Sequence, residues 1–242
     1  MSAIHFSYFG TAQRALILFP GWTHPAQKEP KFINELSKKF KIASLELPGY
    51  MRNQDLSNYQ DFLFLAKELH TELKKTKIDF SAFIGFSLGS RLISTYLKLY
   101  PNNIECIFIG YPTEPYQLPI WARILVNNRL FIDILRRNKG FKQFVVNKAL
   151  RTINQDETAV FHPDRVTLTG AFDSLIGLIT SAVNLDTNKK SATFIYGEQD
   201  EYLYEAQKKN LKHLKIIKRA VHNCVRGHEM EVVNLIIQAV GK

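Results

Sequence analysis

The chain has 242 residues, of which 45% are hydrophobic and 22% are charged. This length suits one large domain, and the composition excludes a disordered chain, a collagen-like fibre or a low-complexity segment. Lys and Arg outnumber Asp and Glu by 32 to 22, which gives a net charge of +10. The basic residues occur as scattered pairs without a long basic run, so we predict a solvated basic surface and no specific nucleic-acid partner.

The apolar runs and the cysteines bear on the compartment of the protein. No apolar run reaches about 18 residues, the length needed to cross a membrane, so no integral membrane association is expected. Residues 1–5 show no charged segment followed by an apolar one, so no secretory signal is expected. Cys106 and Cys224 are too few for a disulfide scaffold and are predicted to be reduced thiols. These features predict a cytoplasmic protein.

Short apolar runs alternate with helical patterns along most of the chain. The runs that predict strands cover residues 4–8, 15–19, 42–47, 80–84, 104–109, 192–196 and 214–220. The patterns that predict helices between them cover residues 30–40, 57–76, 88–99, 166–184 and 229–240. Strands that are apolar on both faces and are joined by helices indicate an α/β fold with a mostly parallel, doubly wound sheet.

The alternation stops between Tyr111 and about Val166. This stretch has no strand signal but shows helix-like patches at 119–138 and 141–151. A connection this long predicts an inserted helical cap over residues 112–165, which leaves residues 1–111 and 166–242 as the core. Its aromatic side chains, together with Arg123, Arg136 and Arg137, would suit a substrate with an apolar acyl part and an anionic group.

The pentapeptide Gly85-Phe86-Ser87-Leu88-Gly89 lies between an apolar run and a helical pattern. This is the strand–turn–helix context of a nucleophile elbow, in which a strained turn presents the serine hydroxyl above the sheet edge. Glycine is expected on both sides because a side chain there would collide with the turn. The backbone N–H of Leu88 would open the helix and could stabilise an oxyanion.

A nucleophilic serine needs a base and a group that orients the base. Asp200 follows the run at 192–196, and His222 follows the run at 214–220, so both project to the carboxyl edge of the sheet, where ligands bind in such folds. Glu198 and Glu201 are alternative acids, and Asp200 is favoured by its position three residues after Gly197.

His228 is the alternative base. It comes immediately before the last predicted helix, where a capping role is ordinary. The positive end of that helix would also disfavour the imidazolium that a general base must become. His222 is therefore the favoured base.

These elements together resemble the α/β-hydrolase superfamily. The resemblance rests on the oxyanion-loop segment at 19–22, the Pro-Gly region at 45–50, the elbow at 85–89, the acid loop at 197–200 and His222. It implies a Ser–Asp–His hydrolase with its site under a helical cap, and the N–H of Trp22 as the second oxyanion donor. The chain departs from the family pattern at Pro20, Glu46 and Met51, where His, Asp and Gly are usual.

The expected reaction is hydrolysis of a carboxylic ester in a small-molecule acyl substrate. Ser87 would attack the acyl carbonyl, while Phe86 and Trp121 would line the substrate pocket. No cofactor is implied, and no metal, because the histidines lack metal-ligand spacing and no nucleotide fingerprint occurs. Thioesters, lactones and C–C bonds are alternative substrates for the same residues. A non-catalytic binding protein on the same fold is the alternative from another class.

Overall fold

A single seven-stranded sheet forms the centre of the molecule in the computed structural model, which describes residues 3–51, 53–112, 128–153, 162–181, 192–203 and 211–241. The strand order is β1-β3-β2-β4-β5-β6-β7, and β1 alone runs antiparallel to its neighbour. The strands are β1 His5–Phe9, β2 Ala15–Phe19, β3 Lys41–Glu46, β4 Phe80–Phe86, β5 Glu105–Ile109, β6 Ala192–Gly197 and β7 Leu214–Ile217. The predicted mostly parallel α/β sheet is confirmed.

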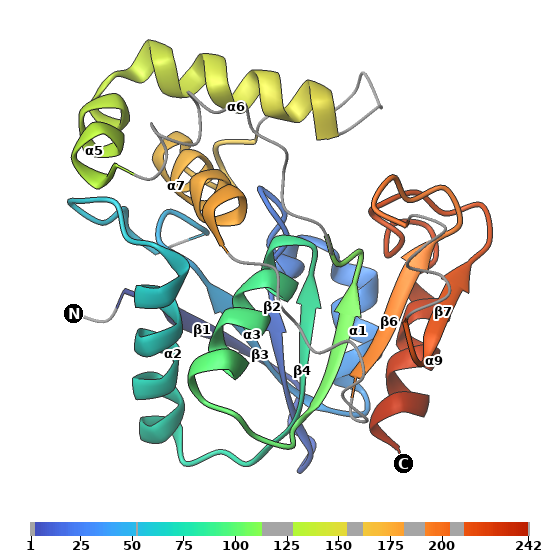
Figure 1. Cartoon of the computed structure of the whole chain (residues 1–242). Coiled ribbons are helices and arrows are strands. Elements are labelled where there is room, and N and C mark those ends of the chain that lie inside the picture. Colours follow the sequence, from blue (N-terminus) through green and yellow to red (C-terminus); the bar gives the residue numbers. More distant parts are fainter. Residues whose placement is uncertain are drawn as a thin grey trace.

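Helices cover both faces of this sheet (Figure 1), with α1 and α9 on one face and α2 and α3 on the other. Successive residues of a strand face opposite sides of the sheet, so each apolar strand contributes side chains to two separate hydrophobic cores. Ile17 and Phe19 of β2 pack in the core with α2 and α3, whereas Leu16 and Leu18 pack in the core with α1 and α9. The helices are α1 Pro30–Ser37, α2 Phe62–Thr76, α3 Leu88–Leu99, α5 Arg129–Arg137, α6 Lys139–Ile153, α7 Leu168–Thr180 and α9 Glu229–Val240, with a short 3₁₀ helix at Ala26–Lys28.

The helix predicted from residue 57 begins five residues later. Asp61 has extended backbone, and its carboxylate accepts a hydrogen bond from the N–H of Phe64 at 2.9 Å. This bond caps the helix and fixes its start at Phe62. The strand predicted over 214–220 ends at Ile217, because the chain turns there with Arg219 at a φ of 60°.

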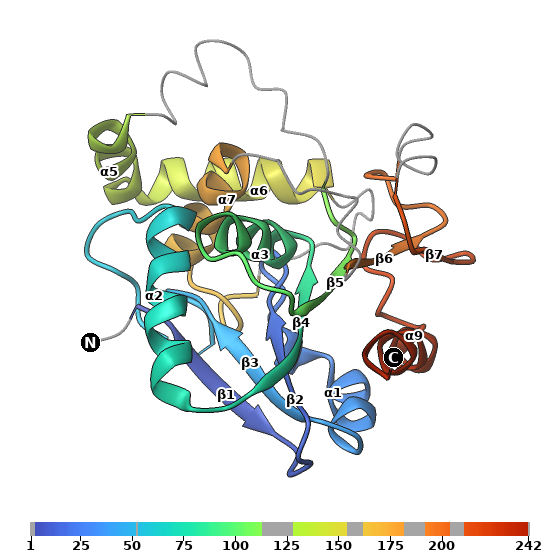
Figure 2. The same cartoon turned by 60° about the horizontal axis from the view of Figure 1, so that its bottom comes forward.

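Helices α5, α6 and α7 form a layer above the carboxyl ends of the strands, as Figures 1 and 2 both show. Helix α7 packs on α5 and α6 and also contacts α3, and the core on that face of the sheet continues into this layer through Ile132, Val146 and Phe172. The cap predicted over 112–165 contains α5 and α6. Within the described residues, no helix is long and apolar enough to cross a membrane.

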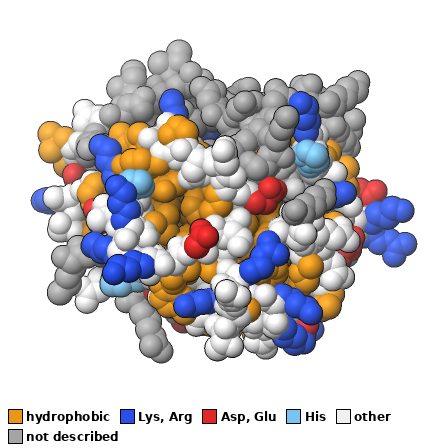
Figure 3. Space-filling model, turned by 90° about the horizontal axis from the view of Figure 1, so that it is seen from below, with side chains coloured by type: hydrophobic (Ala, Val, Ile, Leu, Met, Phe, Trp, Pro, Cys, Tyr) orange, Lys and Arg blue, Asp and Glu red, His pale blue; other side chains and the backbone are white. Residues whose placement is uncertain are grey.

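The opposite face of the molecule carries Lys and Arg side chains dispersed among uncharged and hydrophobic ones (Figure 3). Lys38 pairs with Glu35, and Lys75 pairs with Glu72, each one helical turn apart. Such exposed pairs contribute little to stability.

Candidate active site

Ser87 occupies the turn between the end of β4 and the start of α3. Its φ is 44° and its ψ is −103°, a backbone conformation that costs a serine about 1–3 kcal/mol. Hydrogen bonds hold the turn in place: the N–H of Ser87 donates to the carbonyl of Ile109 at 2.8 Å, and the hydroxyl of Ser90 donates to the carbonyl of Gly85 at 2.7 Å. The strain is thus held by the adjoining strand and helix.

The two glycines of the elbow are required for different reasons. A Cβ on Gly85 would lie 2.7 Å from the backbone of Ser90, within the turn, as expected from the sequence. A Cβ on Gly89 would instead lie 2.6 Å from the carbonyl oxygen of Phe19. Gly89 therefore lets α3 approach the end of the neighbouring strand β2. The expectation that a side chain at position 89 would collide with the turn is wrong, because it would collide with β2 instead.

The structure brings Ser87, His222 and Asp200 into one hydrogen-bonded series. Nε2 of His222 lies 2.9 Å from Oγ of Ser87, and its Nδ1 lies 3.0 and 3.1 Å from the two carboxylate oxygens of Asp200. Asp200 is buried and also accepts a hydrogen bond from the N–H of Tyr202 at 2.9 Å. The three side chains come from loops at the carboxyl ends of β4, β6 and β7.

The surroundings of His222 favour its protonated form. Burial alone would lower the pKa of His222, but the hydrogen bond to Asp200 and the negative charges of Asp200 and Glu201 outweigh it, so the pKa is raised. The ring of Tyr202 packs edge-on against the imidazole, with the ring centroids 4.7 Å apart. This setting therefore raises the affinity of the imidazole for a proton.

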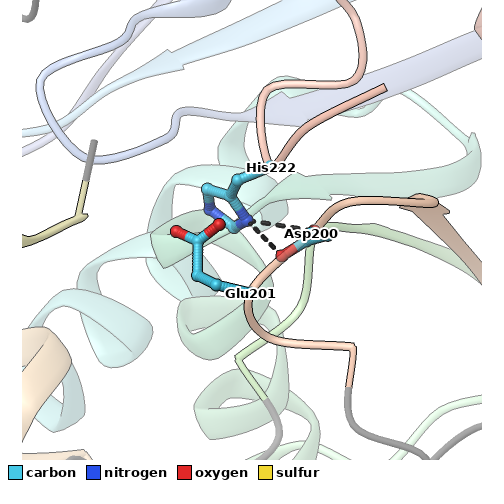
Figure 4. Close-up of side chains that lie close together, drawn as sticks. All are labelled: Asp200, Glu201 and His222. Carbon is cyan, nitrogen blue, oxygen red and sulfur yellow. Dashed lines mark hydrogen bonds and ion pairs between the residues drawn. The ribbon is translucent and has the colours of Figure 1, made fainter. Parts of the chain in front are cut away.

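The alternative acids lie in different places. Glu198 is exposed, and its carboxylate accepts a hydrogen bond from the N–H of Arg219 at 3.0 Å, which closes the turn after β7. Glu201 lies beside His222 (Figure 4). A carboxylate oxygen of Asp200, a carboxylate oxygen of Glu201 and a ring nitrogen of His222 all lie within 4.8 Å of one another. Sequence reasoning treated Glu201 only as a rival of Asp200 and missed that both carboxylates meet the same imidazole.

His228 occupies the N-terminal cap position of α9. Its side chain makes no capping hydrogen bond, and its Nδ1 lies 3.5 Å from the carboxylate of Glu231, one turn along the helix. The position agrees with the one expected from the sequence, although the ring pairs with a glutamate instead of capping the helix.

Two backbone N–H groups belong to residues near Ser87: Leu88 follows it in the chain, and Trp22 lines the same cavity. Leu88 is the first residue of α3, and the first N–H groups of a helix have no acceptor within it. Trp22 lies in a tight turn closed by hydrogen bonds between Gly21 and His24 at 3.1 and 3.2 Å. Within the described part of the chain, neither the N–H of Leu88 nor that of Trp22 has a hydrogen-bond acceptor.

A cavity of about 120 Å³ opens beside Ser87. Phe86 contributes to it, as expected from the sequence, whereas Trp121 lies outside the described residues. Sequence reasoning missed Leu178, which lies on α7, the helix that follows the predicted cap insertion. The lining residues are Gly21, Trp22, Thr23, His24, Phe86, Ser87, Ile109, Leu178, His222 and Asn223.

Arg136, expected as part of an anion-binding lining, is committed to the protein itself. Its side chain is 9% exposed, and its Nε lies 2.8 Å from the carboxylate of Asp173 on α7. Its remaining nitrogens donate to the carbonyls of Leu56 and Ser57. Burial raises the pKa of Asp173 to about 6, while the charge of Arg136 opposes this rise. The guanidinium therefore ties α5 to α7 and is not free for a substrate.

Comparisons with known proteins agree with this fold. Residues 14–132 match the family model described as alpha/beta hydrolase fold. Over 160 residues the chain is 25% identical to the pimeloyl-[acyl-carrier protein] methyl ester esterase of Proteus mirabilis (strain HI4320). That match covers 64% of this chain and 55% of the relative, so it spans little more than half of the relative's length.

Solved structures extend the likeness over the whole chain. A thermophilic esterase from Thermogutta terrifontis superposes with a TM-score of 0.75 at 15% identity, covering 99% of this chain and 94% of that one. The enol-lactonase from Burkholderia xenovorans LB400 superposes with a TM-score of 0.73 at 12% identity, covering 99% and 96%. The topology of the sheet, the family-model match and these structures show that the chain has the α/β-hydrolase fold.

Proposed function

We propose that the protein is a hydrolase that cleaves carboxylic esters through an acyl-enzyme on Ser87, with His222 as general base and acid and Asp200 as the group that orients it. The observation that carries the proposal is the hydrogen-bonded series from Oγ of Ser87 through the imidazole of His222 to Asp200. Each contact has the length that proton transfer and orientation require.

The reaction runs in two halves. Oγ of Ser87 attacks the acyl carbon while its proton passes to Nε2 of His222, and the carbonyl oxygen becomes an oxyanion. The N–H groups of Trp22 and Leu88 stabilise this oxyanion. The C–O bond to the alcohol then breaks, and His222 returns the proton to the departing alkoxide. In the second half, a water attacks the acyl carbon while His222 takes its proton. The bond between that carbon and Oγ then breaks, and His222 returns the proton to Oγ, which releases the acid and restores Ser87.

The cavity supports a small acyl group. Its volume of about 120 Å³ is well below the roughly 300–1,000 Å³ typical of pockets for drug-sized ligands. Trp22, Phe86, Ile109 and Leu178 make its wall largely apolar. Esterases among the related proteins support the same substrate class. We therefore expect short, uncharged acyl chains to react fastest.

The test is to label the protein with a fluorophosphonate and to measure hydrolysis of p-nitrophenyl esters of increasing acyl length. Ser87→Ala is expected to abolish labelling and to lower kcat by about 10⁴-fold or more. Its thermal melting should remain nearly unchanged, because the hydroxyl contributes chemistry and no packing. Ser57→Ala, at an exposed serine, is the matched control and should behave like the unsubstituted protein.

Three results would contradict the proposal. Labelling of another serine in the Ser87→Ala variant would show that the nucleophile is elsewhere. A protein that binds esters but is neither labelled nor active would be a binding protein on this fold. Labelling of Ser87 together with turnover of only thioesters or lactones would retain the nucleophile and overturn the ester substrate.

A further inference from the structure

Glu201 places a second carboxylate beside His222. It follows Asp200 directly in the loop after β6, and its side chain lies alongside the imidazole ring (Figure 4). The hydrogen bonds of the ring go to Asp200 and Ser87, so Glu201 faces His222 without bonding to it. One carboxylate oxygen of Asp200, one of Glu201 and a ring nitrogen of His222 nevertheless lie within 4.8 Å of one another.

The carboxylate of Glu201 makes few other polar interactions with the described residues. Its Oε1 is fully buried and has no hydrogen-bond partner among the described residues. Within the same part of the chain, no Lys or Arg forms an ion pair with it. A buried oxygen without a hydrogen-bond partner lowers the stability of the fold by about 1–3 kcal/mol, and by more when the oxygen is charged. A positive charge on His222 would offset this cost.

The charged groups that act on His222 come from a single loop. Asp200 and Glu201 approach it from the loop after β6, and both raise its pKa, whereas Ser87 from the elbow is uncharged. Burial raises the pKa of Glu201, the charge of Asp200 raises it further, and His222 opposes both. Glu201 and the imidazolium therefore stabilise each other.

We propose that Glu201 is a positioning residue that acts with Asp200 on His222. It stabilises the imidazolium formed when Oγ of Ser87 gives its proton to Nε2, and it limits the movement of the ring. This role rests on the function proposed above. The negative charges of both carboxylates raise the pKa of the ring.

The experiment compares the pH profiles of kcat/KM for p-nitrophenyl acetate in Glu201→Gln and in Glu198→Gln, the matched control in the same loop. Removing the negative charge lowers the proton affinity of His222, so the base is free at lower pH. The acid limb of Glu201→Gln should shift down by about 0.5–1 pH unit, and kcat/KM on the plateau should fall about 3–10-fold. Glu198→Gln should leave the position of the acid limb unchanged and the plateau kcat/KM within about twofold of that of the unsubstituted protein.

A second pair of variants tests whether the two carboxylates share the ring. In an Asp200→Asn background, Glu201→Gln should cost more than it does alone, by about tenfold, because Glu201 is then the remaining carboxylate at the ring. If Glu201→Gln folds poorly, Glu201→Asp keeps the charge and should restore the acid limb at least in part. A shift of the acid limb caused by misfolding would not depend on whether the substituted side chain at position 201 carries a negative charge.

The outcomes separate this role from the function on which it rests. An acid limb that coincides in Glu201→Gln, Glu198→Gln and the unsubstituted protein would overturn the role of Glu201, with labelling of Ser87 still intact. Absence of Ser87 labelling in the unsubstituted protein would instead overturn the proposed function. Equal costs of Glu201→Gln with and without Asp200 would show that the two carboxylates act independently.

Discussion

Ser87 shows how much of the site is decided by backbone geometry at single residues. Its φ of 44° is tolerated because Gly85 admits the backbone of Ser90 and Gly89 admits the carbonyl of Phe19. The turn then projects Oγ to within 2.9 Å of Nε2 of His222. The strain is a cost to stability that this region of the fold supports, as is common where side chains are presented for chemistry.

The two histidines near the last helix are expected to differ sharply. His222→Ala should lower kcat by on the order of 10⁴-fold or more, because it removes the group that we propose accepts the proton of Ser87. His228→Ala should cost about tenfold or less, since its ring lies against Glu231 on the helix surface. Both variants are compared by steady-state kinetics and by thermal melting. The opposite order, with both variants folded, would make His228 the base.

At the scale of elements, α7 is the helix that joins the cap to the site. Its Ala171 carbonyl accepts a hydrogen bond from the indole of Trp22 at 2.8 Å, and its Ser174 accepts one from the hydroxyl of Tyr50 at 3.0 Å. Leu178 of the same helix lines the cavity. Helix α7 therefore contacts the turn at Gly21–His24 as well as α5 and α6, so a change in α7 would reach the site.

The ion pair between α5 and α7 is expected to stabilise this layer. Arg136→Ala leaves Asp173 buried without its partner, which should lower the free energy of unfolding by about 3–5 kcal/mol. Arg137→Ala, at the exposed neighbour, should change it by less than about 0.5 kcal/mol. Urea unfolding of the two variants is the measurement. Equal stability of both variants would show that Arg136 does not hold α5 on α7.

At the scale of the whole molecule, the positive charge is unevenly distributed. Residues 129–153, which form α5 and α6, contain seven Lys or Arg and one Asp, a net +6 of the total +10. The outward sides of these helices also expose Leu130, Ile134 and Phe144. The sequence suggested scattered charge because the basic residues are not consecutive, but two packed helices bring them into one layer.

Binding to polyanions is expected to be electrostatic and without sequence preference. Affinity for duplex DNA should fall steeply with added salt, because each phosphate contact releases a counterion. Charge reversal at Lys148 and Arg151, both exposed on α6, should weaken this binding more than reversal at Lys74 and Lys75 on α2. Fluorescence anisotropy across a salt series is the measurement. A sequence-selective complex that persists at physiological salt would contradict this expectation.

The sequence by itself determined the sheet and its crossovers, because a buried strand and an amphipathic helix are local patterns with their own periods. It also indicated Ser87, since the strand–turn–helix context lies within a few residues of it. The tertiary structure decided what depends on residues far apart in the chain: Gly89 against Phe19, Arg136 against Asp173, and two carboxylates against His222. Such contacts arise only when separate loops and helices meet in the folded chain, and local periodicity carries no information about them.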